Sequence, residues 1–82
     1  MHKYQKQKVP PKRSAVHPLV HWLWAEINKQ RASQLDVEKR SGVSTSAMRK
    51  WRTGERTPRV LEFDAVAQSL GYEITIRRKK DD

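Results

Sequence analysis

The sequence predicts a small, mainly α-helical domain in which four short helices are followed by a single β-strand. Eighty-two residues with a hydrophobic content of 35% allow one domain with a small core. Apolar residues recur at helical spacing in two segments and gather on one side of a third, while a fourth is marked by residues that start and stop helices. The C-terminal segment instead alternates apolar and polar residues, which is the period of a strand. We therefore expect a basic arm at 1–15, a helical domain at 16–71 and a strand with a charged tail at 72–82.

The first helix is expected from about Pro18 to Arg31, because proline is well tolerated in the first turn of a helix. Trp22 lies off the apolar stripe of this helix. We expect its ring to pack under the C-terminal strand or in a subunit interface, the alternative being a partly exposed ring. The stripe itself consists of Leu19, Val20, Leu23, Trp24 and Ile27.

The second and fourth helices are delimited by a hydroxyl cap and by glycines. Ser33 can cap a short helix from Gln34 to about Arg40, and Gly42 can end it in the left-handed conformation. The fourth helix follows a loop and stops at Gly71. Its apolar stripe consists of Val60, Phe63, Val66, Ala67 and Leu70.

The third helix, at about 45–52, has one apolar and one polar side at 100 degrees per residue. Ser44 or Thr45 can cap it and Gly54 stops it. A helix of this kind can be anchored by its apolar side and can present its polar side to a DNA major groove. The alternative is a solvated cationic face without a ligand. The apolar side holds Ala47, Met48 and Trp51, and the polar side holds Thr45, Ser46, Arg49 and Lys50, with Arg52 at the margin.

The C-terminal strand is expected to need a partner, because a lone strand is not stable. Its apolar face would carry Tyr72, Ile74 and Ile76. The simplest partner is the same strand of a second copy, which would form a two-stranded ribbon between subunits. One alternative is that residues near Val9 in the arm pair with it, and another is that the apolar face packs on the first helix of the same chain.

The charge of the chain favours a polyanionic partner, since the formal net charge is +9. The first 15 residues hold five cations and no acidic residue. Such an arm can wrap a duplex or enter its minor groove, or it can add only non-specific attraction. The cations of the arm are Lys3, Lys6, Lys8, Lys12 and Arg13.

Several classes of protein are not expected from this composition. The longest apolar run is too short to cross a membrane, the N-terminus lacks the apolar core of a secretory signal, and there is no cysteine. His17 and His21 have the spacing of two metal ligands, but no third ligand is evident. We expect a cytoplasmic protein, associated with the nucleoid when bound to DNA, that has no metal site and no cofactor and is not an enzyme.

The order of these features resembles the phage repressor and Cro type of helix-turn-helix domain, the XRE family. The resemblance covers about Leu19 to Ile76, and it implies a lambda-repressor-type domain resembling a four-helix bundle, extended here by the C-terminal strand and the flexible basic arm. Its marks are Ser33-Gln34, Gly42-Val43-Ser44, Met48, Trp51, Gly54, Thr57-Pro58 and Ala67-Gln68-Ser69-Leu70-Gly71.

The resemblance also implies roles for single residues. By position in the family pattern, Thr45, Ser46, Arg49 and Lys50 face base edges, and Gln34, Arg52, Arg56 and Arg59 contact phosphates. Two positions depart from that pattern. Leu35 stands where a polar residue is usual, and Glu38 stands where alanine is usual. We expect Glu38 to tilt outward or to pair with a cation such as Arg49 or Lys50, which would affect the spacing of the two helices.

The function expected from the sequence is regulation of transcription by sequence-specific binding of double-stranded DNA. A homodimer would place two recognition helices on a roughly palindromic operator and repress by occupying it. The first alternative is an antitoxin that represses its own operon and also binds a toxin protein. The second is a non-specific nucleic-acid-binding protein, in which the arm and the net charge matter more than the third helix.

Overall fold

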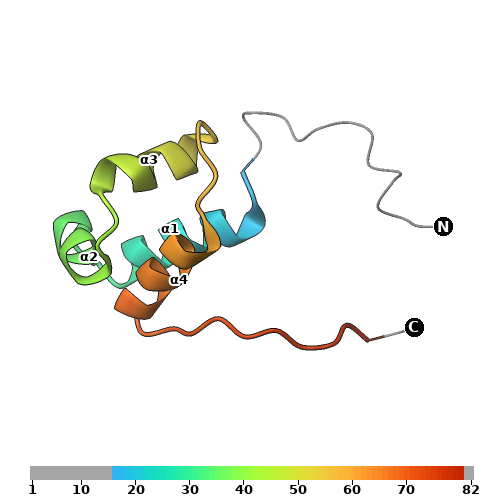
Figure 1. Ribbon diagram of the computed structural model, residues 1–82. Coiled ribbons are helices and arrows are strands. Elements are labelled where there is room, and N and C mark those ends of the chain that lie inside the picture. The colour runs from blue at the N-terminus through green and yellow to red at the C-terminus, as the bar shows by residue number, and fades with distance from the viewer. Residues whose placement is uncertain (1–15, 81–82) are drawn as a thin grey trace.

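The computed structural model describes residues 16–80, which form four α-helices joined by short loops (Figure 1). The mainly helical class expected from the sequence is confirmed. The basic arm predicted at 1–15 lies outside the described residues, as do the last two residues of the chain. The helices are α1 (Pro18–Lys29), α2 (Gln34–Ser41), α3 (Thr45–Thr53) and α4 (Val60–Ser69).

Serine side chains start α2 and α3, as the sequence predicts. The Ser33 hydroxyl accepts a hydrogen bond from the Asp36 N–H at 3.4 Å, and Ser44 accepts one from the Ala47 N–H at 3.0 Å. Each contact satisfies one of the N–H groups that a first helical turn leaves without a partner. Of the two caps considered for α3, Ser44 is therefore the one used, and Thr45 is the first helical residue.

Single residues in the left-handed conformation mark the ends of the helices. Gly42 ends α2 with φ of 79° and Gly54 ends α3 with φ of 83°. The prediction that α1 extends to Arg31 is wrong by two residues, because the helix ends at Lys29 and Arg31 itself has φ of 55°. A non-glycine residue in this conformation carries a strain of about 1–2 kcal/mol. Because the residue here is an arginine, the sequence holds no glycine that would mark the end of α1.

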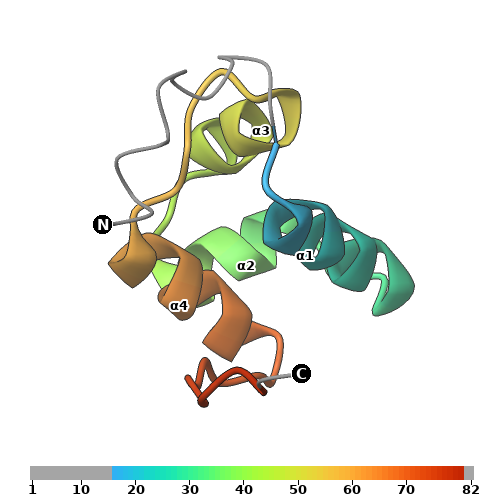
Figure 2. The same ribbon diagram turned by 90° about the vertical axis from the view of Figure 1, so that its right-hand side faces the viewer.

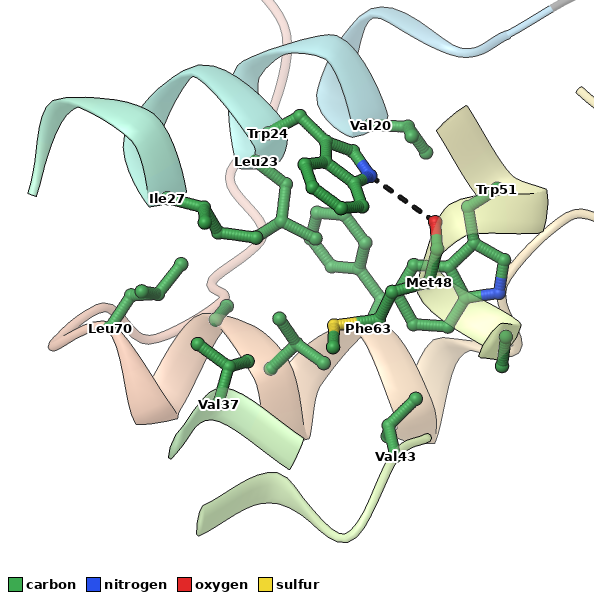
Figure 3. Close-up of a cluster of buried hydrophobic side chains, with 13 residues drawn as sticks. Val20, Leu23, Trp24, Ile27, Val37, Val43, Met48, Trp51, Phe63 and Leu70 are labelled. Atoms are coloured by element: carbon green, nitrogen blue, oxygen red, sulfur yellow. Dashed lines mark hydrogen bonds between the residues drawn. The ribbon is translucent and has the colours of Figure 1, made fainter. Parts of the chain in front are cut away.

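One hydrophobic core joins all four helices (Figure 3). Leu23 of α1, Met48 of α3 and Val66 of α4 have no exposed surface. In Figure 3 the indole of Trp24 also points from α1 toward α3. The buried apolar residues are Val20, Leu23, Trp24, Ile27, Val37, Val43, Ala47, Met48, Trp51, Phe63, Val66, Ala67 and Leu70.

Two residues assigned to apolar stripes are not part of this core. Val60 is 80% exposed and Leu19 is 53% exposed. Both lie in the first turn of their helices and at the margin of the stripe when residues are placed at 100 degrees each. A side chain at the margin of the stripe is directed less toward the core, so it stays in contact with solvent.

The helix α3, which is expected from the sequence to face DNA, and the C-terminal segment lie at opposite ends of the molecule (Figures 1 and 2). Between these two ends, α2 packs against both α3 and α4, and α1 packs against α3. None of the helices in the described part of the chain is long and apolar enough to span a membrane.

The strand predicted after Gly71 is not formed in the single chain, where residues 72–80 have no regular secondary structure. They continue from the end of α4 as a separate trace that turns back below the helices and then extends past them (Figure 1). A strand needs a neighbour for its backbone hydrogen bonds, and the other described segments are helices or short loops. The alternating pattern of 72–77 therefore has no partner within the described part of this chain.

Candidate nucleic-acid interface

The position of α3 is fixed by its apolar side. Met48 and Trp51 are almost completely buried, and Ala47 is buried beside them. From α1, the indole N–H of Trp24 donates a hydrogen bond to the Met48 carbonyl at 3.2 Å (Figure 3). A buried side chain of α1 is thus bonded to the backbone of α3, in addition to the apolar packing between the two helices.

The opposite side of α3 carries the four residues expected to meet base edges. Ser46 and Arg49 are exposed, while Thr45 and Lys50 are half-buried. All four belong to one helix whose other side is locked in the core. Their backbone positions are therefore rigid, and their side chains leave the helix on the side away from the core.

Arg49 is linked to the first residue of α2. Its Nε donates a hydrogen bond to Gln34 Oε1 at 3.2 Å. This contact uses only Nε of the guanidinium group, so the two terminal nitrogens can donate to another acceptor. Gln34 and Arg49 were assigned separate roles from the sequence, and the structure joins them in one arrangement.

Glu38 behaves differently from both expectations for it. It neither tilts away nor pairs with Arg49 or Lys50. Its Oε1 accepts hydrogen bonds from the Thr45 hydroxyl at 2.7 Å and from the Thr45 N–H at 2.9 Å. A glutamate near the end of α2 thus supplies a second cap at the start of α3, beside that of Ser44.

These contacts keep Glu38 ionised. The hydrogen bond from the Thr45 side chain and then that from the Thr45 backbone lower the pKa of Glu38 below its ordinary value, and the smaller effect of burial acts in the opposite direction. The site therefore holds one carboxylate close to the start of a helix that is otherwise rich in cations. The sequence signal for this role is a carboxylate in the last turns of one helix, seven residues before the first residue of the next.

The remaining cations of the site surround the end of α3 and the loop behind it. The guanidinium carbon of Arg52 lies 4.6 Å from the centroid of the Trp24 ring, which is a cation–π contact. Arg56 and Arg59 are exposed. The backbone N–H of Arg59 donates to Glu62 Oε1 at 3.1 Å, which fixes the start of α4 and leaves the Arg59 side chain outside the contact.

The stretch 45–59 has a strong excess of positive charge. It contains five cations, namely Arg49, Lys50, Arg52, Arg56 and Arg59, against one acidic residue, Glu55. A surface of this sign attracts phosphates over a distance of about one Debye length, ~8–10 Å. The excess of positive charge therefore includes α3, which is anchored in the core, and the loop that follows it.

The C-terminal segment contacts α1 through its first residue, Tyr72. The Tyr72 hydroxyl donates to Glu26 Oε1 at 2.9 Å, and the Tyr72 ring meets Trp22 edge to face, with centroids 4.9 Å apart. Ile74 and Ile76 are exposed, Ile76 by 93%. The alternative in which the whole apolar face of a strand packs on the first helix is therefore wrong. Trp22 does contact this segment, through Tyr72.

The sequence did not predict the buried carboxylate of Glu26, which accepts the hydrogen bond from Tyr72. Glu26 is buried on α1, and its Oε1 also accepts a hydrogen bond from Gln30 Nε2 at 3.3 Å. Gln30 in turn donates to the Leu70 carbonyl at 3.1 Å. A carboxylate with these two donors on one oxygen can be buried at an acceptable cost, and it ties the end of α4 to α1.

One of the two histidines considered as metal ligands caps a helix. His17 precedes α1, and its Nδ1 accepts a hydrogen bond from the Leu19 N–H at 3.0 Å, so it caps that helix. Across residues 16–80, no group of three or more His, Cys, Asp or Glu side chains could hold a metal ion.

Comparison of the chain with models of protein families, with curated proteins and with solved structures gave no match.

Proposed function

We propose that this chain is a sequence-specific double-stranded DNA-binding regulator of transcription that reads its site with α3. The observation that carries this proposal is the division of α3 into two sides. Met48 and Trp51 fix the helix in the core, while Ser46 and Arg49 are exposed on the other side. A rigid helix with donors and acceptors on its outer side matches the width and the base edges of a major groove.

The surroundings of α3 support the same function. The helix α2 and the turn after Gly42 lie immediately before α3, which is the order of a helix-turn-helix. The excess of cations in 45–59 favours binding to phosphates.

Two kinds of contact are expected within this function. Base edges would be read by Thr45, Ser46, Arg49 and Lys50. The hydrogen bond from Arg49 to Gln34 would orient the guanidinium group of Arg49 toward the O6 and N7 of a guanine. The phosphate contacts would be made by Gln34, Arg52, Arg56 and Arg59, which position the protein without carrying sequence information.

Selection of bound fragments from random DNA tests the proposal directly. We expect an enriched sequence for the wild-type chain. Arg49→Ala and Lys50→Ala should each relax the preference at particular base pairs by about 1–3 kcal/mol. Arg59→Ala should weaken binding to operator and random DNA alike. Lys29→Ala, which removes the same charge at the end of α1, is the matched control. Equal losses on all DNA for every variant would indicate charge-driven, non-specific binding instead.

We propose further that the protein acts as a homodimer through the segment 72–80. Ile74 and Ile76 are exposed on a segment whose start is held on α1 by Tyr72. Pairing with the same segment of a second copy would supply backbone partners and cover both isoleucines. The two α3 helices would then meet half-sites about one helical turn apart, ~34 Å or ~10 base pairs.

Light scattering of the chain with and without operator DNA tests the dimer. We expect a dimer for the wild type and a monomer for Ile74→Asp, while Arg77→Asp, whose side chain lies on the other face of the alternating pattern, should change the state less. A monomer in the wild type, both free and on DNA, would contradict the dimer and leave the reading role of α3 untouched.

A second candidate function is that of an antitoxin, which would bind a toxin protein in addition to its operator. The observation that favours it is an exposed apolar pair, Val60 and Leu61, which are 80% and 79% exposed at the start of α4. Neither residue belongs to the proposed DNA contacts or to the paired segment. Co-purification with the product of a neighbouring gene, lost in Leu61→Ser while operator binding persists, would support this function over that of a free-standing repressor.

A further inference from the structure

The hydrogen bond between Thr45 and Glu38 fixes which hydrogen-bonding role the Thr45 hydroxyl can play. A threonine hydroxyl has one hydrogen to donate and two lone pairs that accept. A carboxylate has no hydrogen and can only accept. In the contact of 2.7 Å between Thr45 Oγ1 and Glu38 Oε1, the hydroxyl hydrogen therefore lies on the line to Glu38.

The contact is not needed to start the helix. Ser44 already caps α3 by accepting from the Ala47 N–H, and Glu38 accepts separately from the Thr45 N–H at 2.9 Å. The hydroxyl of Thr45 is thus held in addition to two backbone contacts that stabilise the same turn. The low pKa of Glu38 means that the carboxylate remains the acceptor at neutral pH.

We propose that Glu38 is a specificity-determining residue that acts through Thr45, by taking the hydroxyl hydrogen and leaving Thr45 Oγ1 as an acceptor toward the DNA. This inference rests on the proposed function, in which α3 reads the major groove. Along one strand, adenine and cytosine present an amino donor in that groove, while guanine and thymine present a carbonyl acceptor. An acceptor-only Thr45 favours the first pair of bases and is repelled by the second.

The test uses DNA in which single functional groups are removed. Fragment selection with wild type and Thr45→Val first identifies the base pair that depends on the hydroxyl, since this variant keeps the size of the side chain and the N–H that donates to Glu38. At that pair, adenine is then replaced by purine, which lacks only the amino group, or cytosine by pyrimidin-2-one. The wild type is expected to lose about threefold to tenfold in affinity, and Thr45→Val is expected to lose nothing further.

Variants of Glu38 separate positioning from mere stability. In Glu38→Ala the hydroxyl hydrogen is free to turn toward the DNA, so the preference for an amino donor at this one pair should fall while the other positions keep theirs. Glu38→Gln retains an acceptor oxygen and should restore the wild-type preference. Thermal unfolding of each variant, followed by circular dichroism, establishes that binding is measured on folded protein.

Two results would overturn the inference while leaving the proposed function standing. One is that removal of the amino group affects wild type and Thr45→Val equally, or affects neither. The other is that Glu38→Ala weakens every position of the site by the same factor, since Glu38 would then serve only the stability of the turn. If the wild type enriches no sequence at all, the proposed function fails first, and with it the premise of the inference.

Discussion

Replacement of Gly42 by alanine is expected to lower the free energy of unfolding by about 1 kcal/mol. Gly42 has φ of 79°, and a Cβ added there would meet no atom within 4 Å. The cost therefore comes from the backbone alone, where the left-handed region costs an L-residue roughly 1–2 kcal/mol. Part of this is offset because alanine restricts the unfolded chain. For a domain of this size the melting temperature should fall by about 4–8 °C, as measured by circular dichroism.

A D-alanine at position 42, introduced by chemical synthesis, provides the decisive comparison. It adds the same methyl group but prefers positive φ, so it should stabilise the chain by about 0.4–1 kcal/mol. Gly71→Ala is the matched control, because Gly71 has φ of 94° and the same open surroundings but lies after α4. It should lose similar stability, because the same backbone cost applies at a different helix end. If both enantiomers at position 42 destabilise the chain alike, the backbone explanation is refuted and a hidden steric contact is responsible.

Three further results are expected. Because the pKa of Glu38 is lowered, its stabilising effect is present above the ordinary value of 4.5 and disappears as the pH falls through its folded pKa. The melting temperature should therefore fall less steeply toward acid in Glu38→Gln than in wild type. The hydrogen bond to Glu26, followed by burial, raises the pKa of Tyr72 above 10.0, so the stability linked to its protonated phenol is full below that value and is lost as the pH rises through the folded pKa. An ultraviolet titration compared with that of Tyr72→Phe checks this, and two phenols of equal, ordinary pKa would contradict it. Trp24→Phe removes the N–H that bonds to Met48 and should cost about 1–2 kcal/mol in urea unfolding, with unchanged stability as the contrary outcome.

Local chemistry accounts for the parts of the fold that the sequence predicted. The hydroxyls of Ser33 and Ser44 and the left-handed Gly42 act within a few residues, so their effects can be recognised without the tertiary structure. The end of α1 was misplaced because Arg31 takes the left-handed conformation that glycine usually marks. Val60 was assigned to the core by its spacing, which does not tell how far the neighbouring helices extend.

The contacts that were not predicted join residues that are distant along the chain. Glu26 and Tyr72 are 46 residues apart, and Trp24 and Met48 are 24 apart. Periodicity indicates which side of a helix is buried, but it does not identify the partner across the core. Glu38 shows the same limit at short range, because its contact with Thr45 depends on how the turn places α2 relative to the start of α3.

The two tryptophans of α1 connect the two ends of the molecule that the proposed function uses. Trp24 bonds to the backbone of α3, and Trp22, two residues earlier and therefore on a different side of the helix, contacts Tyr72 at the start of the C-terminal segment. If two chains pair through that segment, α1 is the element that sets the direction of each α3 relative to the dimer axis. A change at Trp22 should then alter the preferred spacing of the half-sites without altering the bases read within each half-site. A change on the outer side of α3 should do the reverse, so one selection experiment on both kinds of variant can separate reading from pairing.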